Sequence, residues 1–365
     1  MGEPLRIGVV GVGTISGQYL AQLPALPNLR LTAVADLDVA RAAAVGGQQG
    51  VPGTTVDALL ARDDVDAVLN LTVPAAHVEV GLHAVAAGKH VYAEKPLARS
   101  TAEAAPLLAA AADAGLRVGS APDTVLGTGL QTARRLLDTG VVGRPVAASA
   151  FWGAPGHERW HPSPHFYYRP GAGPLLDMGP YYLSALVTLL GPVARVSGVA
   201  RRSDRARQVA SGPLAGAPVP VEVDTHVSAL LEHVSGATST VTTSFEVWAT
   251  RAPLLEVYGT AGTIAVPDPN RFADPVEVFT QDDPGWRTAP VSAGYVDAGR
   301  GVGLADMARA IETGRPHRAS GELAYHVLEI MEAVASAADA ATVVPLRSTV
   351  ARPAAVPHGA SPATW

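Results

Sequence analysis

The stretch "RIGVVGVGTIS", residues 6–16, decides the fold expected for the first part of the chain. Gly11, Gly13 and the small Ser16 directly follow a β-type run, in a pattern close to G-x-G-x-x-G/A. The first glycine permits a tight turn, the second lets backbone approach a diphosphate, and a small third residue lets strand and helix pack closely. The stretch therefore predicts a dinucleotide-binding turn. The residues expected to contact the cofactor there are Gly11, Gly13, Thr14 and Ile15.

The next β-type run ends at Asp36, within "AVADLD". A carboxylate at this place accepts hydrogen bonds from the adenosine ribose and repels a 2′-phosphate. The following residue is Leu37, which cannot receive a phosphate, so NAD is the predicted cofactor. Arg41 lies close by and keeps NADP possible.

The order of β-type and helical runs divides the chain into two parts. Up to about residue 120, β-type runs alternate with alanine-rich helical stretches, which predicts an α/β Rossmann domain with a doubly wound parallel sheet at 1–122. Later β-type runs are long and joined by short turns, which predicts an α+β domain with a large open, predominantly antiparallel sheet at 123–347. Its last helix is expected to pack back on the first domain, and 348–365 to form a loosely ordered tail. Helices are expected near 125–138, 177–190, 303–313 and 322–340.

Composition excludes several classes of partner. The chain has 365 residues, a formal net charge of −6, 16% charged residues and no cysteine. We therefore expect no nucleic-acid or membrane partner, and neither a disulfide nor a thiolate site. No apolar run reaches the ~20 residues of a membrane span, and the glycine-rich turn leaves no room for a signal peptide, so a cytoplasmic protein is expected.

Lysine is rare, and this makes "YAEKPLA", residues 92–98, informative. The chain has only two lysines, Lys89 and Lys95, and Lys95 directly follows a β-type run. The pKa of a lysine falls when the ammonium is desolvated, whereas an arginine stays protonated. Taken alone, Lys95 fits a surface lysine at the end of a strand; together with Glu94, Pro96 and the motif upstream of them it is interpreted as a group that exchanges protons.

Four motifs in this order resemble the Gfo/Idh/MocA oxidoreductases, the glucose-fructose oxidoreductase and inositol dehydrogenase family. They are the glycine-rich turn, then Thr72, Pro74 and His77, then Glu94-Lys95-Pro96, and "GAGPLLDMGPYYL" from Gly171. The resemblance runs over about residues 5–345. It implies that Thr72, Pro74, His77 and Glu94 lie on the cofactor side, and that a cis peptide bond precedes Pro96.

The resemblance also implies the catalytic residues Lys95, Asp177 and Tyr181. Relatives carry a histidine four residues after the aspartate, whereas this chain has Tyr181, as some branches of the family do. Positions four apart share a helix face, so Asp177 and Tyr181 are expected in one cleft. A phenol titrates near ~10 unless its neighbours lower its pKa, so the proton relay is the part of the family pattern that this departure puts in question.

The function implied is hydride transfer between a secondary alcohol of a sugar, polyol or glycoside and the nicotinamide, with Lys95 taking the hydroxyl proton. Aromatic and histidine side chains between residues 151 and 173 suit a sugar ring, or instead fill the domain junction. Residues expected to bind substrate are Lys95, His165, Tyr168, Asp177 and Tyr181. Two other functions stay open: an NAD-dependent glycoside hydrolase that oxidises its substrate transiently, and a non-catalytic dinucleotide-binding regulator.

Three further expectations concern single features. His157, His161 and His165 are four apart, but prolines among them disfavour a helix, so no metal site is expected. Asp123 either supplies polarity near the nicotinamide or, as we favour, caps the helix that follows it. An apolar sheet face near residues 221–247 is expected to pack against another subunit, which predicts a homodimer or homotetramer.

Overall fold

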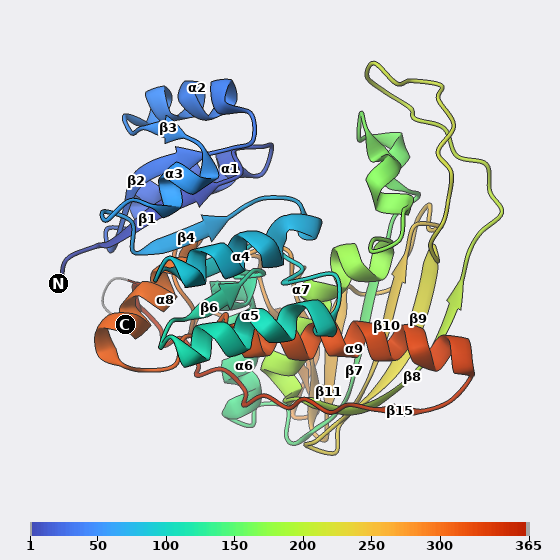
Figure 1. Ribbon diagram of the computed structural model, residues 1–365. Coiled ribbons are helices and arrows are strands. Elements are labelled where there is room, and N and C mark those ends of the chain that lie inside the picture. Colours follow the sequence, from blue (N-terminus) through green and yellow to red (C-terminus); the bar gives the residue numbers. More distant parts are fainter. Residues whose placement is uncertain (1, 363–365) are drawn as a thin grey trace.

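A computed structural model describes residues 2–362 and shows a six-stranded parallel sheet in the first part of the chain (Figure 1). The strands lie in the order β3-β2-β1-β4-β5-β6, and each neighbouring pair is parallel. Their bounds are β1 Leu5–Val10, β2 Leu29–Ala35, β3 Gly53–Thr54, β4 Ala67–Asn70, β5 His90–Ala93 and β6 Val118–Ser120. The predicted doubly wound sheet is confirmed.

Helices cover both faces of this sheet, because most residues of its central strands β1, β4 and β5 are buried and apolar. From the first part of the chain these are α1 Ser16–Gln22, α2 Val39–Gln49, α3 Val56–Leu60, α4 His77–Ala86 and α5 Thr101–Asp113, with 3₁₀ turns η1 Leu23–Ala25 and η2 Pro74–Ala76. A late helix, α8 (Val302–Thr313), joins them. Leu304 and Met307 of α8 share a buried cluster with Tyr19 of α1.

The second sheet has nine strands in the order β14-β13-β12-β11-β7-β10-β9-β8-β15. Every neighbouring pair is antiparallel except β7 and β10, which are parallel. The strands are β7 Pro145–Gly153, β8 Val193–Arg201, β9 His226–His233, β10 Thr238–Ser244, β11 Leu255–Gly259, β12 Gly262–Val266, β13 Glu277–Thr280, β14 Asp283–Thr288 and β15 Val344–Pro345. The predicted open, predominantly antiparallel sheet is confirmed.

Helices α6 (Thr128–Asp138), α7 (Pro174–Leu190) and α9 (Gly321–Ala340) pack against one face of this sheet, and η3 Thr124–Leu126, η4 His157–Arg159 and η5 Pro164–Tyr168 are short 3₁₀ turns. The other face is open. Its positions on β9 and β10 include Ser228, Leu230, Thr240 and Thr242. The hydroxyl oxygens of Ser228 and Thr242 lie 3.0 Å apart. The expectation of an apolar face near 221–247 is therefore wrong, since hydroxyl residues predominate there.

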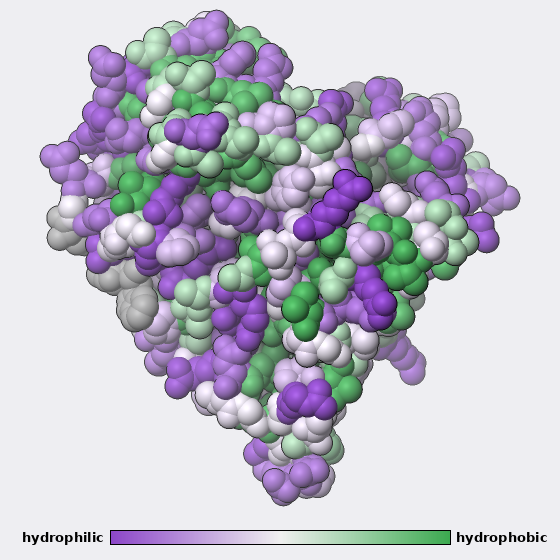
Figure 2. All heavy atoms as spheres, turned by 60° about the horizontal axis from the view of Figure 1, so that its bottom comes forward, coloured by the Kyte–Doolittle hydropathy of each residue, from purple (hydrophilic) through white to green (hydrophobic). Residues whose placement is uncertain are grey.

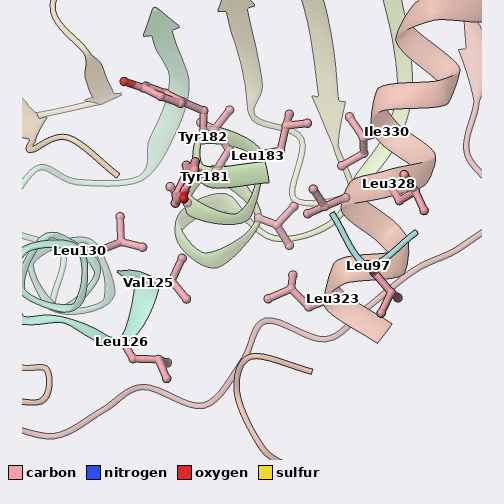
Figure 3. Close-up of a cluster of buried hydrophobic side chains, with 14 of the residues drawn as sticks. Leu97, Val125, Leu126, Leu130, Tyr181, Tyr182, Leu183, Leu323, Leu328 and Ile330 are labelled. Carbon is pink, nitrogen blue, oxygen red and sulfur yellow. The ribbon is translucent and has the colours of Figure 1, made fainter. Parts of the chain in front are cut away.

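A single hydrophobic core joins the two sheets. Figure 3 shows Leu97, which follows β5, beside α9, with Leu183 of α7 and Leu323 and Leu328 of α9 nearby. All four side chains are almost completely buried. The space-filling view shows two lobes separated by a notch at its upper edge (Figure 2). The core thus fixes the lobes to each other.

The segment 348–362 is held on the surface of the fold, so the expected loose tail is wrong for these residues. Val356 is fully buried, its N–H donates to Gln131 Oε1 at 2.8 Å, and its carbonyl accepts from Gly294 at 3.0 Å. Arg318 Nε donates to the carbonyl of Ala354 at 2.8 Å. The last residues of the predicted tail, 363–365, lie outside the described part of the chain. Over residues 2–362, no helix is both long and apolar enough to cross a membrane.

Candidate active site

The glycine-rich turn between β1 and α1 has an open outer surface. Gly11 has a φ of 91°, and a Cβ there would lie 2.8 Å from the backbone of Leu71, so only glycine fits. A Cβ on Gly13 would meet nothing within 4 Å. Ser16 Oγ donates to the Gly13 carbonyl at 2.7 Å and ties the turn to the helix. A diphosphate can therefore approach the backbone of this turn, as the sequence pattern predicts.

Asp36 ends β2 beside the turn. Its carboxylate accepts from the amides of Val12 and Asp38, both at 2.9 Å, and from Arg41 Nη2 at 2.8 Å. Burial alone would raise the pKa of Asp36, but the Asp38 amide and the Arg41 guanidinium outweigh it and lower the pKa. Leu37 is 95% exposed, an apolar surface at the edge where an adenosine would lie. These residues fit a nicotinamide dinucleotide.

His77 fastens the loop after β4 to the loop after β5. Its ring is 1% exposed, with Nδ1 2.7 Å from the Pro96 carbonyl oxygen and Nε2 3.0 Å from that of Thr72. Burial lowers the pKa of His77. Both nitrogens are occupied by backbone, so the direct cofactor contact expected of this side chain is corrected to a supporting role. Pro74 is exposed on the same loop.

Asn70, which the sequence did not single out, organises the same loop. Its Oδ1 accepts from Thr72 N–H at 3.2 Å and Thr72 Oγ1 at 2.7 Å, and its Nδ2 donates to the His77 carbonyl at 3.0 Å. Glu94 is also buried: Oε1 accepts from the Tyr19 hydroxyl at 2.7 Å and Oε2 from the Lys95 amide at 2.9 Å. The expected cis peptide bond, Lys95-Pro96, is present. The segment that carries Lys95 is thus fixed on both sides.

Lys95 and Asp177 form an ion pair across the junction of the two lobes. Lys95 Nζ donates to Asp177 Oδ1 at 2.9 Å and to the Asp177 carbonyl at 2.7 Å. Asp177 lies in the first turn of α7, and Tyr181, one turn later, has its ring centroid 5.2 Å from Lys95 Nζ. The structure therefore brings together the three residues named as catalytic.

The charge state of the pair differs from expectation. Burial lowers the pKa of Lys95, but Asp177, Tyr181 and Glu94 outweigh that effect and hold the pKa above its ordinary value. Burial likewise raises the pKa of Asp177, while Lys95 and His157 lower it, to about 2. The pair is an ammonium and a carboxylate at neutral pH. The sequence led us to expect a lysine whose pKa is lowered by desolvation, whereas the pKa of Lys95 is raised.

The other lysine, Lys89, has a structural role. Its side chain is nearly buried, and Nζ donates to the carbonyls of Arg62 at 2.8 Å and Val65 at 2.9 Å. Burial lowers its pKa.

His157, on η4, holds the second oxygen of Asp177, with Nε2 2.8 Å from Oδ2. The indole Nε1 of Trp160 donates to His157 Nδ1 at 3.1 Å. Because an indole N–H only donates, Nδ1 is an acceptor and the ring proton lies on Nε2, facing Asp177. The sequence placed His157 in the substrate-side loop but gave it no role, since it is 20 positions from Asp177.

Arg300 completes the site beside Tyr181, and no sequence pattern indicated it. Its Nη2 donates to Tyr181 Oη at 3.0 Å and to Asn270 Oδ1 at 2.9 Å. Asp123 lies 3.8 Å from Arg300 Nη1 and accepts from the amides of Gly301 at 2.8 Å and Gly303 at 3.2 Å. Asp123 therefore binds the start of α8, and the expectation that it caps the helix following it in sequence is wrong.

The two loop residues expected to bind substrate point elsewhere. Tyr168 is fully buried beside Phe245, and its hydroxyl donates to Glu158, so its assignment to the substrate is corrected. His165 Nε2 lies 3.2 Å from the carbonyl oxygen of Pro218. Tyr167 faces the cleft instead, with its ring 4.3 Å from that of His157. Burial and Asp177 raise the pKa of Tyr167 to about 12.

Buried charges support this loop from behind. Arg207 Nη1 donates to Glu158 Oε1 at 2.8 Å and Nη2 donates to Glu246. Arg205 lies 3.4 Å from Glu158 and 3.5 Å from Glu246. Such paired and hydrogen-bonded charges are costly to break, which fixes the loop that carries His157.

A nicotinamide dinucleotide is the ligand that the turn and Asp36 fit, and the ammonium–carboxylate pair lies at the same edge of the sheet. The family models agree. The model described as "Oxidoreductase family, NAD-binding Rossmann fold" matches residues 5–121, and the GFO/IDH/MocA C-terminal domain matches residues 130–265. The chain belongs to the GFO/IDH/MocA family, which confirms the resemblance and the cofactor class.

Curated relatives carry names of sugar enzymes. The dTDP-3,4-didehydro-2,6-dideoxy-alpha-D-glucose 3-reductase of Streptomyces violaceoruber is 38% identical over 62% of this chain and 66% of its own length. That of Streptomyces antibioticus is 34% identical over 56% of this chain and 62% of its own. The matches thus span less than two thirds of these reductases. D-xylose 1-dehydrogenase (NADP(+)) 2 of Haloferax volcanii is 27% identical over 94% of this chain and all of its own length.

Solved structures share the whole architecture. An NAD binding oxidoreductase from Klebsiella pneumoniae has a TM-score of 0.80 and 25% identity, and covers 94% of this chain and 100% of its own. Levoglucosan dehydrogenase in complex with NADH and L-sorbose has a TM-score of 0.81 at 20% identity, covering 95% of this chain and 100% of its own. The second likeness shows the fold alone.

Proposed function

We propose that the protein is an NAD(P)-dependent dehydrogenase that transfers a hydride between a secondary alcohol carbon of a sugar or polyol and the nicotinamide. The observation that carries this proposal is the Lys95–Asp177 ion pair with Tyr181 against it, at the end of β5 and on the same sheet edge as the dinucleotide-binding turn. Ligands of doubly wound sheets bind at this carboxyl edge. When bound, the cofactor supplies the redox chemistry.

The protein residues hold the reacting oxygen. Lys95 uses two of its three N–H donors on Asp177, which leaves one for a substrate oxygen. Asp177 and His157 fix the direction of the ammonium, and Tyr181 offers a hydroxyl beside it. Such donors polarise a carbonyl in the reducing direction and orient an alcohol in the oxidising direction.

The substrate class follows from the aromatic side chains around His157. Trp160 is 58% exposed and Phe166 is 53% exposed, and Tyr167 lies between the rings of Phe166 and His157. Exposed aromatic faces next to hydrogen-bonding groups suit the apolar face and hydroxyl rim of a sugar. The names of several relatives, which include sugar reductases and inositol dehydrogenases, support the same class.

NAD is the proposed cofactor, with NADP accepted less well, because Asp36 occupies the ribose end of the turn. An enzyme that depends on this cofactor would work in the cytoplasm. We also propose a homodimer or homotetramer, formed through the open face of the second sheet, where the exposed apolar side chains of Val199 and Leu230 lie among hydroxyl residues. Sedimentation velocity would report the assembly; a monomer at micromolar concentration would contradict it.

The test is Lys95→Ala, assayed with NAD⁺ and NADH on a panel of sugars and polyols. Turnover should fall by ~10² to 10³, as for other donors that stabilise charge on a reacting oxygen, while NADH affinity, read from its fluorescence, stays the same. Lys89→Arg is the matched control, because Lys89 contacts only backbone carbonyls away from the cleft.

Three outcomes separate the alternatives. Unchanged turnover in Lys95→Ala would remove this residue from the reaction. Product formation without net NADH would support a glycoside hydrolase that re-reduces its intermediate. Tight NADH binding with no turnover on any panel member would support a regulator.

A further inference from the structure

The parallel pair of strands in the second sheet brings two chain segments to the edge nearest the site. β7 and β10 run side by side in the same direction, and their last residues, Gly153 and Ser244, are paired (Figure 1). The segment after β7 carries His157 of the site. The segment after β10 is tied to it by the Val247 amide, which donates to the Ala154 carbonyl at 3.1 Å. The residues that follow β10 therefore lie beside the substrate-side loop.

Arg159 and Trp248 meet at this place. Arg159 ends η4, two residues after His157, and its guanidinium carbon lies 4.6 Å from the centroid of the Trp248 ring. Both side chains are on the surface, and the indole is 64% exposed. Among residues 2–362, the guanidinium of Arg159 has no hydrogen-bond or ion-pair partner. Its N–H groups are therefore open to a ligand.

The carboxylates near Arg159 are already used by two other arginines. Glu158 accepts from Arg207 at 2.8 Å and lies 3.4 Å from Arg205. Glu246 accepts from the same Arg207 and lies 3.5 Å from Arg205. These four charges cancel. Arg159 is thus an unbalanced cation at the rim of the cleft, in a chain whose formal net charge is −6.

We propose, on the basis of the function proposed above, that Arg159 is a specificity residue that binds a phosphate group on the sugar substrate. The substrate class is then a sugar that carries a phosphate ester or a nucleoside diphosphate. A guanidinium is a planar fork that matches two phosphate oxygens. The indole of Trp248 holds this fork in one orientation through a cation–π contact, which lowers the cost of ordering it on binding.

The position of Arg159 decides which anion fits. The hydrogen-bonded chain that begins at Lys95 continues through Asp177 to His157 and Trp160. Arg159 points instead to the segment after β10. An anion bound there belongs to a substituent that projects from the ring held at Lys95. A phosphate ester or diphosphate projects in this way, whereas the carboxylate of a uronic acid is attached to the ring itself.

A merely structural role for Arg159 predicts a different pattern. If the residue only fastened the segment after β10 to η4 through Trp248, its loss would weaken the binding of every sugar alike. A phosphate-binding role predicts a loss that is confined to ligands with a phosphate group.

The first experiment measures binding by isothermal titration calorimetry. The protein is saturated with NADH, so that the dinucleotide site cannot take up the phosphates of a probe. The probes are glucose, glucuronate, glucose 1-phosphate and UDP-glucose. Both phosphorylated probes should bind the wild type more tightly than glucose does. In Arg159→Gln their Kd should rise about 10- to 100-fold, the range for lost charge-assisted hydrogen bonds. Arg159→Lys keeps the charge without the fork and should lose less.

Arg144→Gln is the matched control, because Arg144 is an exposed arginine just before β7, at the opposite end of the same strand. Its Kd values should equal those of the wild type. Trp248→Leu, which removes the contact that orients Arg159, should raise the Kd of the phosphorylated probes about 2- to 5-fold. The proposal fails if neither phosphorylated probe binds the wild type, or if Arg159→Gln binds both as the wild type does.

The probes also separate the two sources of the phosphate. Tighter binding of UDP-glucose than of glucose 1-phosphate, with a loss in Trp248→Leu, would indicate a nucleoside diphosphate whose base lies on the exposed indole. Equal or weaker binding of UDP-glucose would indicate a phosphate ester. Tighter binding of glucuronate than of both would overturn the assignment of a phosphate.

Steady-state kinetics tests the substrate class. In Arg159→Gln, the ratio of kcat/KM for a phosphorylated sugar to that for the free sugar should fall about 10- to 100-fold, through KM rather than kcat. An equal loss with both substrates would indicate the structural role and overturn the proposal. Probe binding that depends on Arg159, without turnover of any sugar, would support the phosphate subsite and contradict the proposed function. Sugar turnover together with probe binding that does not depend on Arg159 would do the reverse.

Discussion

Lys95 shows how a rare residue type can be recognised from sequence while its state cannot. Its place after β5, between a glutamate and a proline, is a local feature and was predicted. Its raised pKa depends on Asp177, which is 82 positions away. The long-range ion pair decides between a lysine that exchanges protons and one that stays charged.

The same limit explains which site residues the sequence missed. Asp177 and Tyr181 share one helix, so their spacing alone placed them together. His157 and Arg300 reach the site from a 3₁₀ turn and from a loop 119 residues after Tyr181. Neither position has a periodic pattern. Tyr168 was chosen over Tyr167 for the same reason, since a 3₁₀ turn gives no sequence signal for which ring faces inward.

At the ribose end of the cofactor site, Asp36→Ser should change the choice of cofactor. The substitution removes a charged hydrogen-bond acceptor, worth about 1.5–3 kcal/mol, so kcat/KM for NAD should fall by ~10 to 100-fold. It also frees Arg41 from its ion pair, so the value for NADP should rise relative to NAD. Steady-state kinetics with both cofactors measures the ratio.

The control at this position is Arg41→Ala combined with Asp36→Ser. The double variant should lose the relative gain with NADP, because the cation that would receive the 2′-phosphate is absent. Better use of NADP by Arg41→Ala alone would contradict the assignment of both residues.

Among the elements, α8 illustrates how distant segments stabilise one helix. Asp123, 178 positions earlier, binds the amide that opens it. Within the helix, the fully buried carboxylate of Asp306 accepts from Arg315 Nη2, the Arg318 amide and the Tyr295 hydroxyl, each at 2.8 Å. The helix itself was predicted near 303–313, within one residue of its observed bounds. Its capping and its charge network could not be, because they depend on residues from elsewhere.

Asp306→Asn should destabilise the protein by about 3–5 kcal/mol, because it leaves the buried charge of Arg318 uncompensated. Urea unfolding monitored by circular dichroism measures this. Burial alone would raise the pKa of Asp306, but Arg318 and Arg315 lower it. Its contribution is therefore full above the pKa of the unfolded chain, ~3.9, and is lost as the pH falls through the lower folded value.

Below about pH 4, the free energy of unfolding should accordingly fall less steeply with decreasing pH in Asp306→Asn than in the wild type. Asp283→Asn is the control: its pair with Arg287 is exposed and should contribute less than about 1 kcal/mol. If both variants lost the same free energy of unfolding, burial would not be what makes the Asp306 ion pairs contribute more to stability.

The sheet of the second part was predicted in type but not in order. Alternating runs indicated antiparallel strands, and most pairs are antiparallel. The central pair, β7 and β10, is parallel, and its partners lie 91 positions apart in sequence, as in the pairing of Ser244 with Gly153. Sequence patterns fix which residues alternate along a strand, whereas the partner of each strand is set by tertiary packing.

At the scale of the whole molecule, α9 belongs to both lobes. It packs on α5 and β6 of the first lobe and on α7 and β8 of the second. Leu328 lies on it near Leu97 and lines a small cavity with Pro96, Pro122 and Met331. We therefore expect the two lobes to unfold together.

Leu328→Ala should remove about 2–5 kcal/mol and lower the stability of both lobes equally. Trp152, Trp160, Trp248 and Trp286 lie in the second lobe, so their fluorescence reports it, and amide hydrogen exchange in β1 and β4 reports the first. Val343→Ala, at a position 54% exposed, should change stability by less than about 0.5 kcal/mol. Faster exchange confined to one lobe would show that α9 does not couple them.

The two lysines have a practical consequence for labelling. Lys89 is anchored by carbonyl oxygens beneath the surface and Lys95 lies in the cleft, so the outer surface carries arginine as its long-chain cation. Acylation needs a free amine, and Lys95 is held as an ammonium by Asp177 while the Lys89 side chain is buried. Reagents that acylate amines should therefore spare both side chains in the folded protein, apart from reaction at any free α-amino group, and the extent of lysine acylation becomes a direct gauge of unfolding.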